Sequence, residues 1–171
     1  MLPQTLRIID ANINRAGEGL RFLEDVARFL LDDSHLTERL KILRHEIAQS
    51  VSNYSVGLLF ERDSAGDVGS TQALAAEGKP NVLSLVRANA KRVEEALRVI
   101  EEIAKLPEVS SSLDSSKFQK ARFAVYTLEQ DLVSCFLRRD KKEKLAGLYV
   151  ILDTGALRGR DEVKVVQEVI K

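Results

Sequence analysis

The sequence is poor in cysteine, tryptophan and histidine, and these gaps exclude several kinds of site. Its 171 residues include one cysteine, no tryptophan and two histidines. The single Cys135 cannot form an internal disulfide. His35 and His45 lack the spacing of a metal-binding pair. A zinc site is therefore not expected, and we expect both histidines on the surface.

Long hydrophobic runs and an excess of charge of one sign are also missing. The 26 basic residues balance 26 acidic ones, so no overall field attracts nucleic acid or an anionic membrane. No apolar run approaches the ~20 residues that a membrane span needs. The N-terminus lacks the basic-then-apolar pattern of a signal peptide. We therefore expect a cytoplasmic globular protein that binds neither nucleic acid nor membrane.

The common nucleotide-binding loops are absent as well. The sequence contains no Gly-x-x-x-x-Gly-Lys-Ser/Thr loop. Gly17-Glu-Gly19 is not a dinucleotide fingerprint, because no strand precedes it. Any site for a phosphorylated ligand must be built in another way.

What the sequence does contain is an internal repeat. Residues 11–27 recur as residues 88–104, and eight positions are identical when the two segments are aligned without gaps. The shared positions are Ala11, Asn12, Arg15, Glu18, Leu20, Arg21, Glu24 and Ala27, which align with Ala88, Asn89, Arg92, Glu95, Leu97, Arg98, Glu101 and Ala104. Such a repeat indicates a duplicated supersecondary unit.

A helical projection at about 100° per residue suggests where the repeated polar residues point. On this projection Asn12 and Arg15 lie close to the centre of the apolar stripe, with Glu18 at its edge, and the second copy places Asn89, Arg92 and Glu95 likewise. Arg21, Glu24, Asp25 and Arg28, with their counterparts Arg98, Glu101, Glu102 and Lys105, project outward. We therefore expect asparagine and arginine to face the core.

Hydrophobic spacing predicts four long helices. The first runs from about Thr5 to before Asp32, with Ser34 as the cap of the second, which runs from about Leu36 towards Gly57. Asn81 caps a third helix that ends before Pro107. A fourth starts at Ser115 or Ser116 and runs to about Arg139, with Arg122 and Glu129 inside its apolar face. Residues 61–80 form a polar connection between the two halves.

The pattern changes after residue 140. Residues 141–144 form a charged linker, 147–152 a short apolar strand, and a helix follows from Asp161. We predict an all-α, four-helix bundle-like domain over residues 1–140, made of two tandem helical hairpins related by a pseudo-two-fold repeat. Residues 141–171 would add one βα unit. Because a lone strand leaves its backbone unpaired, we expect this unit to begin a second domain.

Two interpretations of the inward-facing polar residues remain open. A buried arginine needs a partner, so the cluster is either a satisfied polar network that fixes helix pairing or a pocket in which arginines bind phosphate or carboxylate. Arg44 flanks the stripe of the second helix and belongs to the same candidate set. In the connection, Asp63 and Asp67 are either turn residues or ligands of Mg²⁺.

Several segments together resemble a known family. Residues 7–21, Leu43-Arg-His45, Arg62-Asp63 with Gly66-Asp-Val-Gly69, and residues 87–98 are similar to the small hydroxymethylpyrimidine-phosphate kinase domain of thiamin synthesis, which differs from the ribokinase-like type. The resemblance covers roughly residues 5–138. Leu148-Tyr-Val-Ile-Leu-Asp153 with Gly159-Arg160 is similar to the start of thiamine-phosphate synthase, a (β/α)₈ barrel that one βα unit cannot close.

The resemblance implies an ATP- and Mg²⁺-dependent kinase that converts the pyrimidine monophosphate into the diphosphate. Phosphoryl transfer asks mainly for positioning and charge neutralisation. The residues assigned on this basis are Arg15, Arg92, Arg122 and Arg44 for phosphate, Asn12 and Asn89 for the substrate, and Glu18, Glu95, Glu129, Asp63 and Asp67 for catalysis or metal. The ligands would be ATP and the pyrimidine phosphate, and a homodimer is one option for the active unit.

Two other functions fit the same sequence. One is a non-catalytic helical module that dimerises or regulates an attached synthase, which predicts core arginines paired with acids and no cavity. The other is a different helical enzyme that binds an anionic metabolite through arginines, as chorismate mutases do, without ATP or Mg²⁺.

Overall fold

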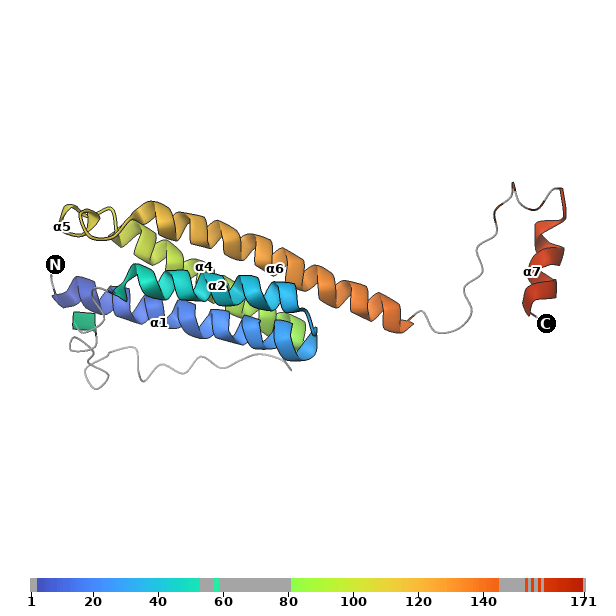
Figure 1. Cartoon of the computed structure of the whole chain (residues 1–171), viewed down its shortest axis with the longest axis horizontal. Helices are drawn as coiled ribbons and strands as arrows, with labels where there is room; N and C mark the ends of the chain where they lie inside the picture. Colours follow the sequence, from blue (N-terminus) through green and yellow to red (C-terminus); the bar gives the residue numbers. More distant parts are fainter. Residues whose placement is uncertain are drawn as a thin grey trace. The chain divides into compact units, whose positions relative to one another are not determined.

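The computed structural model describes residues 3–52, 57–58, 81–144, 153, 155, 157 and 159–170. The chain divides into two compact units, Met1–Arg139 and Asp140–Lys171. The elements are α1 (Pro3–Asp25), the π-helix η1 (Val26–Leu30), α2 (Ser34–Ser50), α4 (Val82–Ile103), α5 (Pro107–Ser110), α6 (Ser115–Lys144) and α7 (Glu162–Ile170) (Figure 1). Over these residues the protein is helical and contains no strand, as the fold class predicts.

Helix α1 packs against both α2 and α4, and its contact with α4 is the more extensive (Figure 1). The buried positions of α1 and α4 alternate in steps of three and four residues, the spacing of a coiled-coil seam. They are Ala16, Leu20, Leu23 and Ala27 on one side and Val93, Leu97, Ile100 and Ala104 on the other, all 4% exposed or less. These are equivalent positions of the sequence repeat.

The helices α1 and α4 approach each other closely at Gly19. A Cβ atom at this position would lie 2.6 Å from Cγ2 of Val93 and 3.2 Å from the backbone oxygen of Asn89. Because glycine has no side chain, the two backbones can come together here. At Gly17, one half-turn earlier, an added Cβ would meet nothing within 4 Å.

Hydrogen bonds define several helix ends. Asn81 caps α4 as predicted, and it forms a capping box in which its side chain accepts from the Ser84 amide while Ser84 bonds back to Asn81. The cap of α2 is Asp33 rather than Ser34, because Oδ1 of Asp33 accepts from the Leu36 amide at 2.9 Å. The end of the first long helix is a π-helix, which the periodicity did not predict.

One hydrophobic core is shared by α1, α2, α4 and α6. It includes Leu23, Leu40, Leu97, Val125 and Leu132, each 2% exposed or less. The equivalence of the two hairpins stays an interpretation of the repeat, and the matching core positions support it. In the described part of the chain no helix is both long and apolar enough to cross a membrane.

The second unit contains α7, the helix predicted to follow Asp161. Oδ1 of Asp161 accepts from the Val163 amide at 2.9 Å and so caps its start. The strand predicted at residues 147–152 lies outside the described residues, and the βα unit therefore stays a prediction.

Candidate functional site

The repeated arginines do not point into the core, which corrects the helical projection. Arg15 and Arg92 are both exposed, and so are Glu18 and Glu95. Each arginine donates to the asparagine three residues earlier, Arg15 to Asn12 at 3.4 Å and Arg92 to Asn89 at 3.1 Å. The projection was right for Asn12, which is buried, but wrong for Arg15, because it gave weight to large apolar side chains whereas the buried positions of α1 include Ala16 and Leu20.

Asn12 and Asn89 make the same local contacts in both copies. The Asn12 side chain donates to the Ile8 carbonyl at 2.8 Å, and the Asn89 side chain donates to the Leu85 carbonyl at 2.9 Å. Asn12 is 5% exposed, whereas Asn89 is half-buried. The side-chain oxygen of each asparagine accepts from the arginine three residues later and so holds it in place. Asp63 and Asp67, the two predicted loop ligands, lie outside the described residues.

Two other repeated residues, Glu24 and Glu101, are buried, although the projection placed them on the solvent-facing side. They are 5% and 2% exposed. Each accepts a hydrogen bond from an arginine of the following long helix: Arg44 Nε donates to Glu24 at 2.9 Å, and Arg122 Nε donates to Glu101 at 3.1 Å. Buried carboxylates need such partners because their desolvation is costly. Two of the predicted phosphate-binding arginines therefore form ion pairs with glutamates that are identical in the two copies of the repeat.

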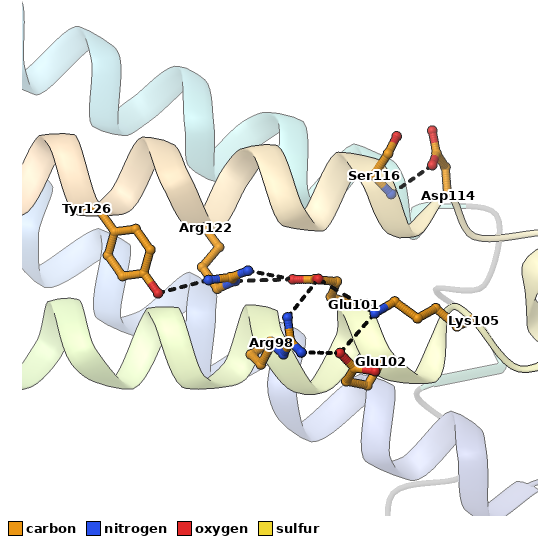
Figure 2. A network of polar contacts seen from close by, with 8 residues as sticks. All are labelled: Arg98, Glu101, Glu102, Lys105, Asp114, Ser116, Arg122 and Tyr126. Atoms are coloured by element: carbon orange, nitrogen blue, oxygen red, sulfur yellow. Dashed lines mark hydrogen bonds and ion pairs between the residues drawn. The ribbon is translucent and has the colours of Figure 1, made fainter.

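In the second hairpin the pair between Glu101 and Arg122 lies within a larger network, shown in Figure 2. Arg98 contacts Glu101 at 3.0 Å and Glu102 at 2.6 Å, and Lys105 contacts Glu102 at 2.9 Å. Arg122 also donates to the Tyr126 hydroxyl at 2.9 Å. That hydrogen bond, followed by the one to Glu101, raises the pKa of Arg122 above its usual value. Arg122 therefore stays charged, and its side chain is only 12% exposed.

The first hairpin has a simpler version of the same network. Arg21 contacts Glu24 at 3.3 Å and Asp25 at 3.6 Å, as Arg98 contacts Glu101 and Glu102. Arg44 is more accessible than Arg122, with a side chain that is 32% exposed. Two arginines thus share one buried carboxylate and remain partly open to solvent.

A groove between α1 and α2 opens onto this part of the first hairpin. Its volume is about 520 Å³, and it is lined by Ile13, Asn14, Gly17, Glu18, Arg21, Arg44, Ile47 and Ala48. Because Gly17 has no side chain, the groove stays open on the α1 side. It brings together two predicted site residues, Glu18 and Arg44, with Arg21, which the projection had placed on a merely solvated face.

A second groove of about 610 Å³ lies between α2 and α6. Lys117 and Lys120 line one side, Glu46 and Gln49 the other, and Ile47 lines both grooves. Each volume is in the range of small-molecule sites, ~300–1,000 Å³. The structure therefore offers two adjacent places for ligands, each with two cationic side chains.

Glu129 lies half-buried on α6, as the sequence predicts, and contacts Glu94 of α4. Glu94 is 4% exposed and was not predicted as a site residue. Burial, and after it the charge of Glu129, raises the pKa of Glu94 above its ordinary value. A signal in the sequence could have found these acids. Glu24, Glu94 and Glu101 each directly follow a buried position of the three-and-four pattern, namely Leu23, Val93 and Ile100.

These features define a protein that is helical over the described residues, with buried glutamate–arginine pairs and grooves suited to anionic small molecules. The chain belongs to the ThiD2 family, whose model matches residues 7–131. It is also similar to proteins named thiamine-phosphate synthase. The one from Rhodopirellula baltica is 42% identical over 118 residues, which is 67% of this chain and 32% of the relative.

Two cyanobacterial relatives carry the same name. The protein of Synechocystis sp. (strain PCC 6803) is 41% identical over 74% of this chain and 36% of its own length. That of Synechococcus sp. (strain WH7803) is 36% identical over 90% of this chain and 43% of its own length. The chain thus spans only about a third to two fifths of these relatives. No solved structure matches it.

Proposed function

We propose that the helical unit works in thiamin biosynthesis and phosphorylates hydroxymethylpyrimidine phosphate with ATP. A phosphate oxygen of the substrate would attack the γ-phosphorus of ATP, the bond from that phosphorus to the β,γ-bridging oxygen would break, and ADP would leave. The attacking phosphate is already ionised near neutral pH, so no strong general base is needed. The ThiD2 membership and the sequence resemblance support this assignment.

The structural observation that carries the proposal is the groove between α1 and α2. Arg21 and Arg44 line it, and both contact Glu24, which fixes the orientation of the two guanidinium groups. Preorganised guanidinium groups bind phosphate through charge-assisted hydrogen bonds. Asn14 and Glu18 would contact the polar edges of a pyrimidine. The groove between α2 and α6, with Lys117 and Lys120, would take the phosphates of the nucleotide.

The reaction that the resemblance implies also requires Mg²⁺ beside ATP, and carboxylates are the protein ligands that this ion prefers. Glu18 lies in the groove, whereas Glu95 lies on the exposed face of the second copy. Glu129, which also belongs to the predicted set, contacts the buried acid Glu94. When bound, the ion would neutralise phosphate charge.

A second candidate function is a non-catalytic module that dimerises or regulates an attached synthase. The relatives favour it more directly than they favour the kinase, because they are named thiamine-phosphate synthase and each is much longer than this chain. The ion pairs of Arg44 and Arg122 also fit a purely structural network.

One assay separates the two functions. The protein is incubated with MgATP and hydroxymethylpyrimidine phosphate, and the pyrimidine diphosphate is sought by mass spectrometry. Product formation supports the kinase, whereas intact substrates at high protein concentration favour the non-catalytic module. Binding of a dicarboxylate without any need for ATP would instead point to another helical enzyme.

A matched pair of variants tests the groove. Arg21→Ala should lower turnover at least ~100-fold, the scale of losing a preorganised charge. Arg98→Ala removes the equivalent arginine of the second copy, which contacts Glu101 and Glu102 in the same way but lies outside the groove. It should change turnover by less than about threefold. Equal losses in both variants, or the larger loss in Arg98→Ala, would contradict the assignment of the groove.

A further inference from the structure

Glu94 is a buried acid whose environment leaves one oxygen without a partner. Its side chain is 5% exposed, and Oε1 is the buried side-chain atom in the described part of the chain for which no hydrogen bond is found. Its other oxygen, Oε2, lies 3.6 Å from Nζ of Lys91, a side chain that is 65% exposed. A buried polar atom without a partner is costly and points to a missing ligand, ion or water.

The neighbour of Glu94 across the helix interface is a second acid, Glu129. This pair lies one heptad from the ion pair of Glu101 and Arg122, along the same antiparallel interface of α4 and α6. At that next position the interface therefore has two carboxyl groups where an ion pair would place opposite charges, and burial, the charge of Glu129 and a hydrogen bond with Glu129 raise the pKa of Glu94. Like charges in contact repel unless a proton or a cation lies between them.

The repeat shows that the acid pair is not part of the common scaffold. The ion pair of Glu101 and Arg122 has its counterpart in Glu24 and Arg44. The repeat position of Glu94 is Gly17, and Val51 lies seven residues after Arg44, as Glu129 lies seven residues after Arg122. Neither can carry charge. Since the first hairpin pairs its helices without these acids, helix pairing does not require them in the second.

We propose that Glu94 and Glu129 together bind a divalent cation at the interface of α4 and α6. Carboxylate oxygens are the ligands that Mg²⁺ prefers, and this ion commonly binds to one or two carboxylates while it keeps several waters. In the described residues no group of three or more His, Cys, Asp or Glu side chains gathers, so water and phosphate would complete the coordination. Glu129 is half-buried and leaves the pair open to solvent on its side.

The place of this cation in catalysis rests on the proposed kinase, but the binding itself does not. Nζ of Lys91 lies 3.6 Å from Oε2 of Glu94. Because the Lys91 side chain is mostly exposed, a divalent cation that binds Glu94 can displace it into solvent. The bound cation would supply charge neutralisation for a phosphorylated ligand. The two acids would hold it on two different helices.

The test uses Mn²⁺ as the probe, titrated into the whole chain without ATP or pyrimidine. Free Mn²⁺ is followed by electron paramagnetic resonance. We expect one saturable Mn²⁺ per chain, displaced by excess Mg²⁺. Glu94→Gln and Glu129→Gln should each weaken binding at least about tenfold, the scale for losing a metal-binding group. The control Glu38→Gln makes the same charge change at an exposed acid of α2 and should bind as the wild type does.

Two outcomes decide against the cation site. If the wild-type chain binds no Mn²⁺ saturably, or if Glu94→Gln and Glu129→Gln bind it as tightly as Glu38→Gln, the pair is not a cation site. Circular dichroism checks the fold, and Glu129→Gln carries the comparison if the more buried variant does not fold. Mn²⁺ binding by a chain without kinase activity would refute the proposed function and leave the cation site standing.

Discussion

The close approach of α1 and α4 at Gly19 makes a quantitative prediction about stability. In a helix interior, replacing glycine by alanine stabilises the helix by about 0.5–1 kcal/mol. At Gly19 the added methyl would lie 2.6 Å from Cγ2 of Val93. Val93 is fully buried, and a β-branched side chain in a helix has essentially one rotamer, so it cannot turn away. The backbone oxygen of Asn89, 3.2 Å away, is equally fixed.

Overpacking of a buried site costs about 1–3 kcal/mol. We therefore expect Gly19→Ala to be about 1–2 kcal/mol less stable than the wild type, despite its better helix propensity. Gly17→Ala is the matched control on the same helix, where the new methyl meets nothing. It should gain about 0.5–1 kcal/mol. The two variants should thus differ by about 2 kcal/mol, or about 4–8 °C in melting temperature for a domain of this size.

The measurement is urea unfolding of the two variants and the wild type, followed by circular dichroism. A double variant adds a sharper criterion, because Val93→Ala removes the methyl that Gly19→Ala would strike. The double variant should be more stable than the sum of the single effects by about 1 kcal/mol. If Gly19→Ala is as stable as Gly17→Ala, or if the two substitutions are additive, the helices do not cross at this residue.

Three further predictions follow from ion pairs and caps. Arg122→Met leaves the buried Glu101 without its partner on α6 and should cost about 2–3 kcal/mol, below the ~3–5 kcal/mol of a wholly unpaired charge, because Arg98 still contacts Glu101. Chemical unfolding should show a loss of less than about 0.5 kcal/mol for the exposed Arg92→Met, and equal losses in the two variants would refute the burial argument. Asn81→Ala removes the capping box of α4 and should cost about 1 kcal/mol, whereas an unchanged unfolding midpoint would contradict that cap. Hydrogen bonds from the side chain and amide of Ser116 lower the pKa of Asp114, so its contribution is complete above the ordinary aspartate pKa and is lost as the pH falls through the lower folded value. The stability difference between the wild type and Asp114→Ala should therefore vanish at low pH in acid titrations. A difference that persists there would contradict a stabilising role for the charged Asp114 carboxylate and its hydrogen bonds with Ser116.

The buried acids explain why the predicted site was only partly right. Arg44 and Arg122 were expected to clamp phosphate, and each forms an ion pair with a buried glutamate. Arg122 is nearly enclosed, whereas Arg44 retains a face towards a groove. The accessible part of the first hairpin is therefore the better candidate for ligand binding, although both hairpins contain the same charged pair.

The sequence by itself determined the helical class, the repeat and much of the helix boundaries. These depend on local signals: apolar spacing, the Asn81 cap and the polar connection between the two halves. It also identified Arg122 and Glu129 as polar residues on an otherwise buried face. Such information is local because each helix forms its backbone hydrogen bonds within itself.

Only the tertiary structure decided which face of α1 and α4 is buried. The contact between α1 and α4 runs along small residues such as Ala16 and Gly19, since two helices approach most closely where side chains are smallest. A helical projection weighted by large apolar residues therefore placed the centre of the buried face at the wrong angle around α1. As a result, Arg15 is exposed and Glu24 is buried, the opposite of what the projection predicted. A pair such as Glu94 and Glu129 depends on the register of two helices far apart in sequence, and no local pattern encodes that register.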